Sequence, residues 1–362
     1  MDNASKYPCE VLYNTANPKY DEEIRLFQGC PTIAVTRGGR IYLGWYAGGT
    51  REPHMDNYNL LIYSDDDGKS WSKPLLVIPS SYEMCVQALD IQIYIDREGA
   101  LHVCWVQNNT LKRSEHPDID GFEVDGYIFN DSRHAEWEMV CYDPDADEPK
   151  FTEPRYMFDG FLRCKPTFLS NGDILYFNYD QLCDRYACSL SSDNGKTFVR
   201  RYGAKKLETK FDETMAYERE DGSIRMFARA IGGEMAETIS HDGGHTWEET
   251  RKSGIVAADT RHYIAKLASG RVLLIYNAHP QNRTNMTIAI SEDDGATWKY
   301  QKTFDTRQFI TYPDAQEKDG VIYMTYDYKR ISEREILFAK FTEDDIINDR
   351  DLEISIVSKP KC

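Results

Sequence analysis

The feature that most constrains the fold is a hairpin pattern that occurs six times along the chain. Each copy is a short turn containing glycine, followed by a strand in which apolar residues alternate with other residues, as is typical of β-structure. The copies read GGRIYLGWY, EGALHVCWV, NGDILYFNY, DGSIRMFAR, SGRVLLIYN and DGVIYMTYD. Six copies predict six blades, so we expect an all-β, six-bladed β-propeller. We expect a single domain over residues 1–362, with a C-terminal tail over about 346–362.

A second repeat, which we call the Asp-box, supports the same architecture. It reads SDDDGKSW, SSDNGKTF, SHDGGHTW and SEDDGATW, and the last three copies begin at Ser191, Ser240 and Ser291. The aspartate can accept hydrogen bonds from turn amides, the glycine supplies a positive φ, and the final aromatic residue packs into the core. We therefore predict an architectural role at the periphery for the aspartates of the four boxes, Asp66, Asp193, Asp242 and Asp293.

Charge and cysteine content narrow the class of partner. The formal charge is −17, and a surface of this sign repels nucleic acid and anionic membranes. The nine cysteines are scattered singly without a CxxC pair, which favours free thiols in a reducing compartment. The first residues show no signal peptide, and no apolar run approaches the ~20 residues that span a bilayer. We expect a cytoplasmic protein, although a secreted chain whose leader has been removed would read the same.

Two parts of the chain lie outside the regular repeats. The segment before Arg25 is expected to supply the outer strand that closes the last blade. The stretch 110–140, rich in His, Asp, Glu and aromatic residues, reads equally as a loop over the pocket or as a surface excursion.

Equivalent positions in the repeats predict a pocket. Nine residues before the turn glycines Gly39, Gly99, Gly172, Gly222, Gly270 and Gly320 stand Cys30, Asp90, Arg163, Glu213, Arg261 and Thr311, the last followed by Tyr312. Seven residues after Gly222 stands Arg229. Charge at the start of an inner strand is costly unless it is paired or meets a ligand. The alternative interpretation is a set of salt bridges between blades.

These residues resemble the sialidase (neuraminidase) family. The stretch DETMAYEREDGSIRMFAR places Glu213 and Arg229, NRTNMTIAISEDDG places Arg283, and TYPDAQEKDGVIYMTYD places Tyr312. The resemblance implies a tyrosine nucleophile at Tyr312 with Glu213 as its base, and arginines that bind the substrate carboxylate at Arg229 and Arg283. A sialic acid carries a carboxylate on its anomeric carbon, which would repel a carboxylate nucleophile, so a neutral tyrosine attacks instead.

The resemblance breaks in the first blade. Sialidases carry an arginine before Ile-Pro there, one of three that bind the carboxylate, whereas this chain reads FQGCPTIAV with Gly29 in the arginine's place. Arg261, Arg163 or Lys165 is predicted to replace it, with Arg261 favoured, and Asp90 is predicted to contact the substrate. The proton donor is expected in GGTREPHMDNYN, where Glu52, His54 and Asp56 are candidates and Asp56 is favoured.

The favoured function is a retaining exo-glycosidase for a terminal, acidic sugar, with a carbohydrate as its partner and no cofactor. A metal site from His54, His262 and an aspartate lacks a supporting spacing such as HExxH, so no metal is expected. The alternatives are a glycosidase for another sugar, a polysaccharide lyase or a metal-dependent deacetylase on the same scaffold, or a carbohydrate-binding propeller without activity. The sequence predicts no oligomeric state.

Overall fold

The structure is a computed structural model that describes residues 4–361, and within them the side chains of all residues except 130–133. The chain divides into two compact units. Unit 1 comprises Met1–Phe161, Asp327–Leu337 and Ile356–Cys362, and unit 2 comprises Leu162–Tyr326 and Phe338–Ser355. The described residues form strands joined by turns, with one short α-helix, α1 (Glu343–Ile347), and 3-10 turns at Ala4–Lys6, Pro18–Tyr20 and Glu22–Ile24. The predicted all-β fold and its six blades are confirmed, and the single-domain organisation stays a prediction.

The first blade is a five-stranded sheet in unit 1, with strand order β1-β5-β4-β3-β2. Its strands are β1 (Leu12–Tyr13), β2 (Phe27–Val35), β3 (Ile41–Gly48), β4 (Tyr58–Ser64) and β5 (Leu76–Pro79). The N-terminal strand β1 pairs with β5, where Leu12 lies opposite Val77. The prediction that the segment before Arg25 closes the last blade is therefore wrong, because this segment adds a strand to the first blade.

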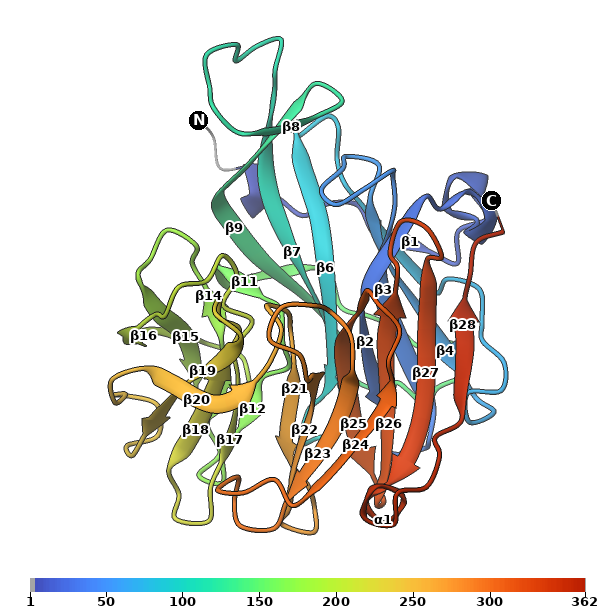
Figure 1. Cartoon of the computed structure of the whole chain (residues 1–362). Helices are drawn as coiled ribbons and strands as arrows, with labels where there is room; N and C mark the ends of the chain where they lie inside the picture. The colour runs from blue at the N-terminus through green and yellow to red at the C-terminus, as the bar shows by residue number, and fades with distance from the viewer. Residues whose placement is uncertain (1–3, 362) are drawn as a thin grey trace. The chain divides into compact units, whose positions relative to one another are not determined.

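The second blade is also in unit 1 and contains the longest strands, β7 and β9 (Figure 1). Its members are β6 (Val86–Ile95), β7 (Leu101–Lys112), β9 (Tyr127–Cys141) and β10 (Arg155–Asp159), with β8 (Phe122–Val124) paired to β9. Residues 110–140 thus continue β7 and β9 as one antiparallel hairpin, in which Thr110 lies opposite Phe129.

Three four-stranded antiparallel sheets of unit 2 follow the sequence order of their strands. They contain β12 (Thr167–Phe168), β13 (Ile174–Tyr176), β15 (Arg185–Ser191) and β16 (Val199–Lys205); β17 (Met215–Glu218), β18 (Ile224–Ala228), β19 (Glu234–Ser240) and β20 (Arg251–Val256); and β21 (Tyr263–Lys266), β22 (Val272–Asn277), β23 (Met286–Ser291) and β24 (Tyr300–Asp305). A two-stranded sheet joins β11 (Phe161–Leu162) to β14 (Asn178–Tyr179).

The last sheet has the strand order β25-β26-β27-β28. Its strands are β25 (Ile310–Lys318), β26 (Val321–Tyr328), β27 (Glu335–Thr342) and β28 (Ile354–Ser358). The outer strand of this blade therefore comes from the segment that the sequence predicted as a tail.

Each Asp-box forms a turn that is bonded to itself. In the first box, Ser64 Oγ and the Ser70 amide donate to Asp66 Oδ1, each at 2.8 Å, and the Ser70 hydroxyl donates to Oδ2 at 2.6 Å. These donors hold the pKa of Asp66 at about 2, and the same bonds recur at Asp193, Asp242 and Asp293. The carboxylates therefore complete the turns, as the sequence predicts.

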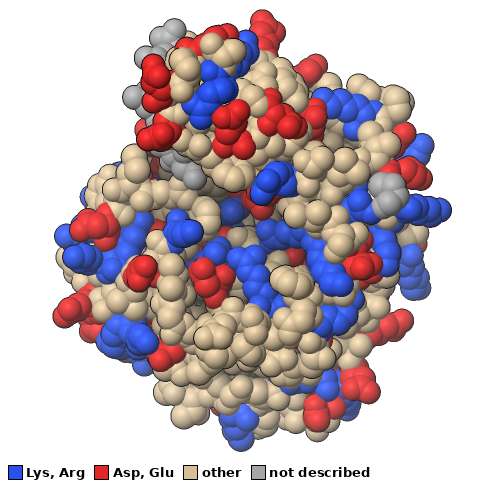
Figure 2. Space-filling model, turned by 45° about the horizontal axis from the view of Figure 1, so that its top comes forward, with Lys and Arg blue, Asp and Glu red and all other residues tan. Residues whose placement is uncertain are grey.

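Apolar side chains pack into buried clusters within the units. In unit 1, Trp45 belongs to one cluster and Trp105 to another, and a cluster of unit 2 includes Leu175 and Met226, all almost completely buried. Among the described residues, no helix is long and apolar enough to cross a membrane. Both signs of charge are present on the face drawn in Figure 2, where Lys and Arg stand among Asp and Glu.

Candidate functional site

Four of the residues singled out by the repeat register share an unusual backbone. Cys30, Asp90, Glu213 and Tyr312 have φ angles of 57°, 50°, 39° and 55°, the left-handed region that side chains rarely adopt. In β2 and β6 the register shifts at these positions, between Gly29 and Thr32 and between Leu89 and Gln92. Such a conformation costs roughly 1–3 kcal/mol per residue and re-aims a side chain out of the regular pleat. Backbone strain of this kind is concentrated at functional sites.

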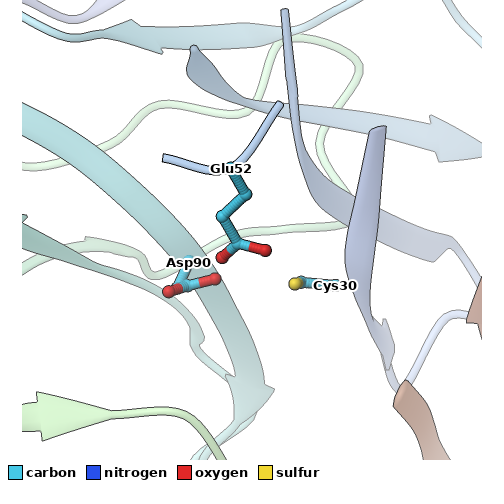
Figure 3. A group of neighbouring side chains, drawn as sticks. All are labelled: Cys30, Glu52 and Asp90. Atoms are coloured by element: carbon cyan, nitrogen blue, oxygen red, sulfur yellow. The ribbon is translucent and has the colours of Figure 1, made fainter. Parts of the chain in front are cut away.

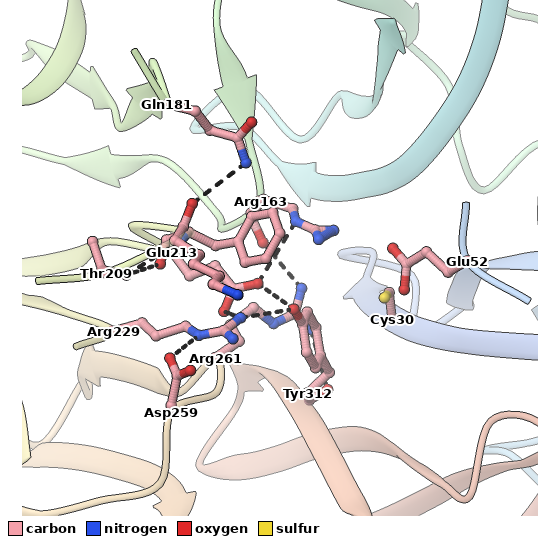
Figure 4. A network of polar contacts seen from close by, with 12 residues as sticks. Cys30, Glu52, Arg163, Gln181, Thr209, Glu213, Arg229, Asp259, Arg261 and Tyr312 are labelled. Atoms are coloured by element: carbon pink, nitrogen blue, oxygen red, sulfur yellow. Dashed lines mark hydrogen bonds and ion pairs between the residues drawn. The ribbon is translucent and has the colours of Figure 1, made fainter. Parts of the chain in front are cut away.

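In unit 2, Glu213 and Tyr312 are joined at the centre of a polar network (Figure 4). Glu213 precedes β17, Tyr312 lies in β25, and both are buried. The Tyr312 phenol donates a hydrogen bond to Glu213 Oε1. Arg229 Nη1 donates to the other oxygen, Oε2, at 3.0 Å and lies 3.5 Å from the Tyr312 hydroxyl.

The charge on Glu213 is set by two opposing effects. Complete burial raises the pKa of its carboxyl group. Arg229, Arg163 and the Tyr312 hydroxyl lower this pKa by more than burial raises it, and the resulting value is about 2. Arg163 Nε lies 3.6 Å from Glu213 Oε1. Glu213 is therefore ionised at neutral pH, and this is the form that can accept a proton from the phenol.

Arg261 lies beside the tyrosine rather than beside the glutamate. Its guanidinium stands 4.8 Å from the centroid of the Tyr312 ring. Nη1 donates to the carbonyl oxygen of Arg163 at 3.0 Å, and Nη2 donates to the carbonyl oxygen of Tyr312 at 3.1 Å. Both terminal nitrogens thus hold main chain, which fits a positioning residue for Tyr312 better than the substrate-binding residue that the sequence predicts.

Asp259 connects the two arginines that the resemblance assigns to the substrate. Arg229 Nε donates to Asp259 Oδ1 at 2.5 Å, and Arg283 Nη2 donates to the Asp259 carbonyl oxygen at 3.2 Å. Sequence reasoning missed Asp259. The only available signal was its position two residues before Arg261, at the entry to β21.

Lys165 has a different environment from the arginines. Its ammonium group pairs with Asp314, and both side chains are largely buried. Burial lowers the pKa of Lys165, and Asp314 only partly opposes this effect. This lysine is predicted to contact the substrate, but the structure joins it to a buried carboxylate that the sequence did not single out.

In unit 1, a second group contains Cys30, Glu52 and Asp90 (Figure 3). The thiol and one oxygen of each carboxylate lie within 4.8 Å of one another, close enough to ligate a single cation. Arg330 Nη1 lies 3.2 Å from Glu52 Oε2 and already compensates one of these charges. The group therefore offers three ligand residues, one of which, Glu52, also pairs with a guanidinium.

The three candidates for the proton donor lie on the loop between β3 and β4. Asp56 is half-exposed and pairs with Lys19 at 3.3 Å. His54 Nε2 bonds Asp125 at 2.8 Å, and its Nδ1 accepts from the Asp56 amide. Glu52 alone among the three lies beside the register positions Cys30 and Asp90.

The structure thus sorts the predicted residues into two sets. In unit 2 it brings together Arg163, Glu213, Arg229, Arg261 and Tyr312, with Arg283 joined through Asp259, and Lys165 bonded to Asp314. In unit 1 it brings Asp90 to Cys30 and Glu52, while Asp56 pairs with Lys19. His262, considered above as a metal ligand, is buried in unit 2, and this burial lowers the pKa of its imidazole to about 4.

Comparison with known proteins supports the repeat analysis. Residues 143–324 match the family model described as a BNR repeat-like domain, and residues 62–73 match the BNR/Asp-box repeat. No curated protein matches the chain in sequence.

Several solved structures have the same fold over most of the chain. A protein of unknown function from Dyadobacter fermentans is 18% identical, with a TM-score of 0.66 over 90% of this chain and 95% of that one. The intramolecular trans-sialidase from Ruminococcus gnavus is 14% identical, with a TM-score of 0.67 over 93% and 98%. The NanB sialidase from Streptococcus pneumoniae is 16% identical, with a TM-score of 0.67 over 97% and 70%. The predicted sialidase-type fold is therefore confirmed.

Proposed function

Because the chain belongs to the family of BNR repeat-like domain proteins, we propose that it is a retaining exo-glycosidase that removes a terminal acidic sugar, with a sialic acid as the first candidate. The observation that carries this proposal is the buried hydrogen bond from the Tyr312 phenol to Glu213. Arginine side chains pair with Glu213 and stack on the Tyr312 ring. A tyrosine that serves only packing does not need an ionised partner in the core, where an unpaired charge is costly.

The proposed reaction begins with attack of the Tyr312 oxygen on the anomeric carbon while Glu213 takes the phenolic proton. A covalent glycosyl–tyrosine intermediate forms, and water then releases the sugar with its configuration retained. The guanidinium groups of Arg163 and Arg261, 5.7 Å and 4.8 Å from the ring centroid, stabilise negative charge that develops on the phenol oxygen during both steps.

For the proton donor we propose Glu52, with Asp56 as the alternative. Glu52 is partly buried beside Cys30 and Asp90, whose left-handed main chains match that of Glu213 at the equivalent position of the repeat register. Asp56 is held by Lys19 at the surface of the same loop. A general acid protonates the leaving oxygen as the glycosidic bond breaks, so Glu52 has to release Arg330 and take up a proton before this step.

The proposal is tested by assaying the purified full-length chain with aryl glycosides of a sialic acid, of uronic acids and of neutral sugars. Turnover of an acidic glycoside, with retention of configuration by NMR, is the expected result. A slowly hydrolysed fluorinated sialosyl fluoride should leave its sugar on the tryptic peptide that contains Tyr312. Turnover of neutral glycosides alone would reject the acidic substrate, and turnover of none would reject the glycosidase.

A further inference from the structure

In unit 1, the side chain of Arg330 lies directly against Gly29. A Cβ atom built on Gly29 would stand 2.7 Å from Cγ, Cδ and Nε of Arg330, a separation that real Cβ atoms essentially never show. The φ angle of Gly29 is not in the left-handed region, so its backbone does not require glycine. The residue that excludes every side chain at position 29 is therefore Arg330, which occupies that space itself.

The position of Arg330 is fixed by β2 on both sides of Gly29. The amide of Gln28 donates to the Arg330 carbonyl oxygen at 3.0 Å. Asp327 Oδ2 accepts from the Cys30 amide at 2.8 Å and from Arg330 Nε at 2.9 Å. Because Asp327 is completely buried, one side of the guanidinium is anchored to a carboxylate that does not reach solvent.

The other side of the guanidinium faces a carboxylate that is nearer to solvent. Arg330 Nη1 donates to Glu52 Oε2 at 3.2 Å, and the two side chains are 15% and 23% exposed. Glu52 belongs to the loop between β3 and β4, so this bond joins an anchored guanidinium to a loop carboxylate. A planar guanidinium binds carboxylates in a fixed, forked geometry, and a ligand carboxylate can take this position in exchange for Glu52.

We propose that Arg330 binds the carboxylate of the substrate, and so takes the role that the sialidase resemblance assigns to an arginine at position 29. This inference rests on the proposed function and narrows its substrate to sugars that carry a carboxylate. The guanidinium arrives from the segment that follows β26 rather than from β2, and glycine at position 29 leaves the space for it.

A binding experiment tests the inference apart from turnover. Calorimetry compares 2-deoxy-2,3-didehydro-N-acetylneuraminic acid with its methyl ester, which differs only by the masked carboxylate. Wild type should bind the acid more tightly than the ester. Arg330→Ala should weaken binding of the acid by about tenfold to hundredfold and remove the preference, since one forked, charge-assisted pair is lost. Lys329→Gln, which removes the adjacent cation, should keep the preference.

A reciprocal exchange tests the location. Gly29→Arg alone should clash with Arg330 and lower both thermal stability and affinity for the acid. The double variant Gly29→Arg with Arg330→Ala removes all three clashing atoms and should recover the preference for the acid over the ester at least partly.

The results separate this inference from the proposed function. If Arg330→Ala keeps the preference for the acid, or if wild type binds neither compound, the inference is wrong. If wild type prefers the acid through Arg330 but hydrolyses no glycoside, the glycosidase proposal fails while this inference stands. If only neutral glycosides are hydrolysed and the acid does not bind, this inference is wrong, whereas the chain is still a glycosidase.

Discussion

The phenol of Tyr312 donates a hydrogen bond to Glu213 across 99 positions of the sequence, and both residues have left-handed main chains. Glu213 stands before β17, at the register position equivalent to Thr311, and Tyr312 is the residue after Thr311, within β25. The strained backbone at both ends of this bond is compensated by the surrounding sheets, which fix the phenol and the carboxylate before any substrate is bound.

Replacing Tyr312 with phenylalanine removes only the oxygen that is proposed to attack. We expect kcat to fall on the order of 10³-fold or more, because the covalent route is lost. The melting temperature should change by only a few degrees, since one hydrogen bond to a charged group contributes about 1.5–3 kcal/mol in a chain of this size. Tyr323→Phe, on the neighbouring strand β26, is the control. Full activity in Tyr312→Phe would remove the tyrosine from the mechanism.

Glu213 should make stability depend on acidic pH. Its pKa in the folded protein is about 2, below its usual value of 4.5, so its contribution is present above pH 4.5 and is lost as pH falls toward 2. Glu213→Gln should lower the melting temperature at pH 7 and flatten its decline over this window. The melting temperature against pH, with exposed Glu249→Gln as control, measures the effect. A slope identical to that of wild type would contradict the assignment.

Arg261→Met should lower kcat while leaving KM almost unchanged, because the arginine bonds main chain around Tyr312. Arg261→Lys should restore part of kcat, since an ammonium can still donate to one of these carbonyl oxygens. Steady-state kinetics with an acidic glycoside separate the two parameters. A raised KM with unchanged kcat would instead support direct contact with the substrate, as the sequence predicts.

Loss of the proton donor should matter most for poor leaving groups. We expect Glu52→Ala to slow cleavage of an alkyl glycoside far more than that of a nitrophenyl glycoside, because a good leaving group departs without protonation. Asp56→Ala should affect both glycosides equally and weakly. The opposite pattern, with Asp56→Ala selective for the alkyl glycoside, would assign the acid to Asp56.

Chelation tests the group formed by Cys30, Glu52 and Asp90. Since Arg330 already pairs with Glu52, we expect EDTA to leave activity unchanged and Cys30→Ser to keep most of it. Loss of activity in EDTA that zinc restores, together with an inactive Cys30→Ser, would identify a metal centre on these ligands.

The repeat pattern predicted the fold and half of the candidate site, because a residue's place in a repeat sets its place in a blade. Glu213, Tyr312, Arg163 and Arg261 were found in this way and lie together in unit 2. The same logic failed for the N-terminal segment. Strand pairing at a blade edge depends on main-chain bonds, such as those between β1 and β5, that the side-chain pattern does not encode.

Partners outside the register positions were the other failure. Asp259 and Arg330 lie between strands and Asp314 lies within β25, and only the folded chain shows that they bond Arg229, Glu52 and Lys165, respectively. Gly29 was noticed as a missing arginine, but sequence alone could not show which side chain fills its space. Asp56, favoured from sequence, and Glu52 are carboxylates of the same loop, and the sequence does not show which side chains surround each of them in the folded loop.

The Asp-box turns have a consequence for the order of folding. Their bonds join residues only two to four positions apart, as from Ser64 and Ser70 to Asp66, so they need no contact with the rest of the chain. Loops this short close within about 100 ns, whereas pairing between distant strands is slow. We therefore expect each turn to form early and to bring together the two strands that flank it. On this hypothesis the left-handed residues at the inner strands are the last to be fixed.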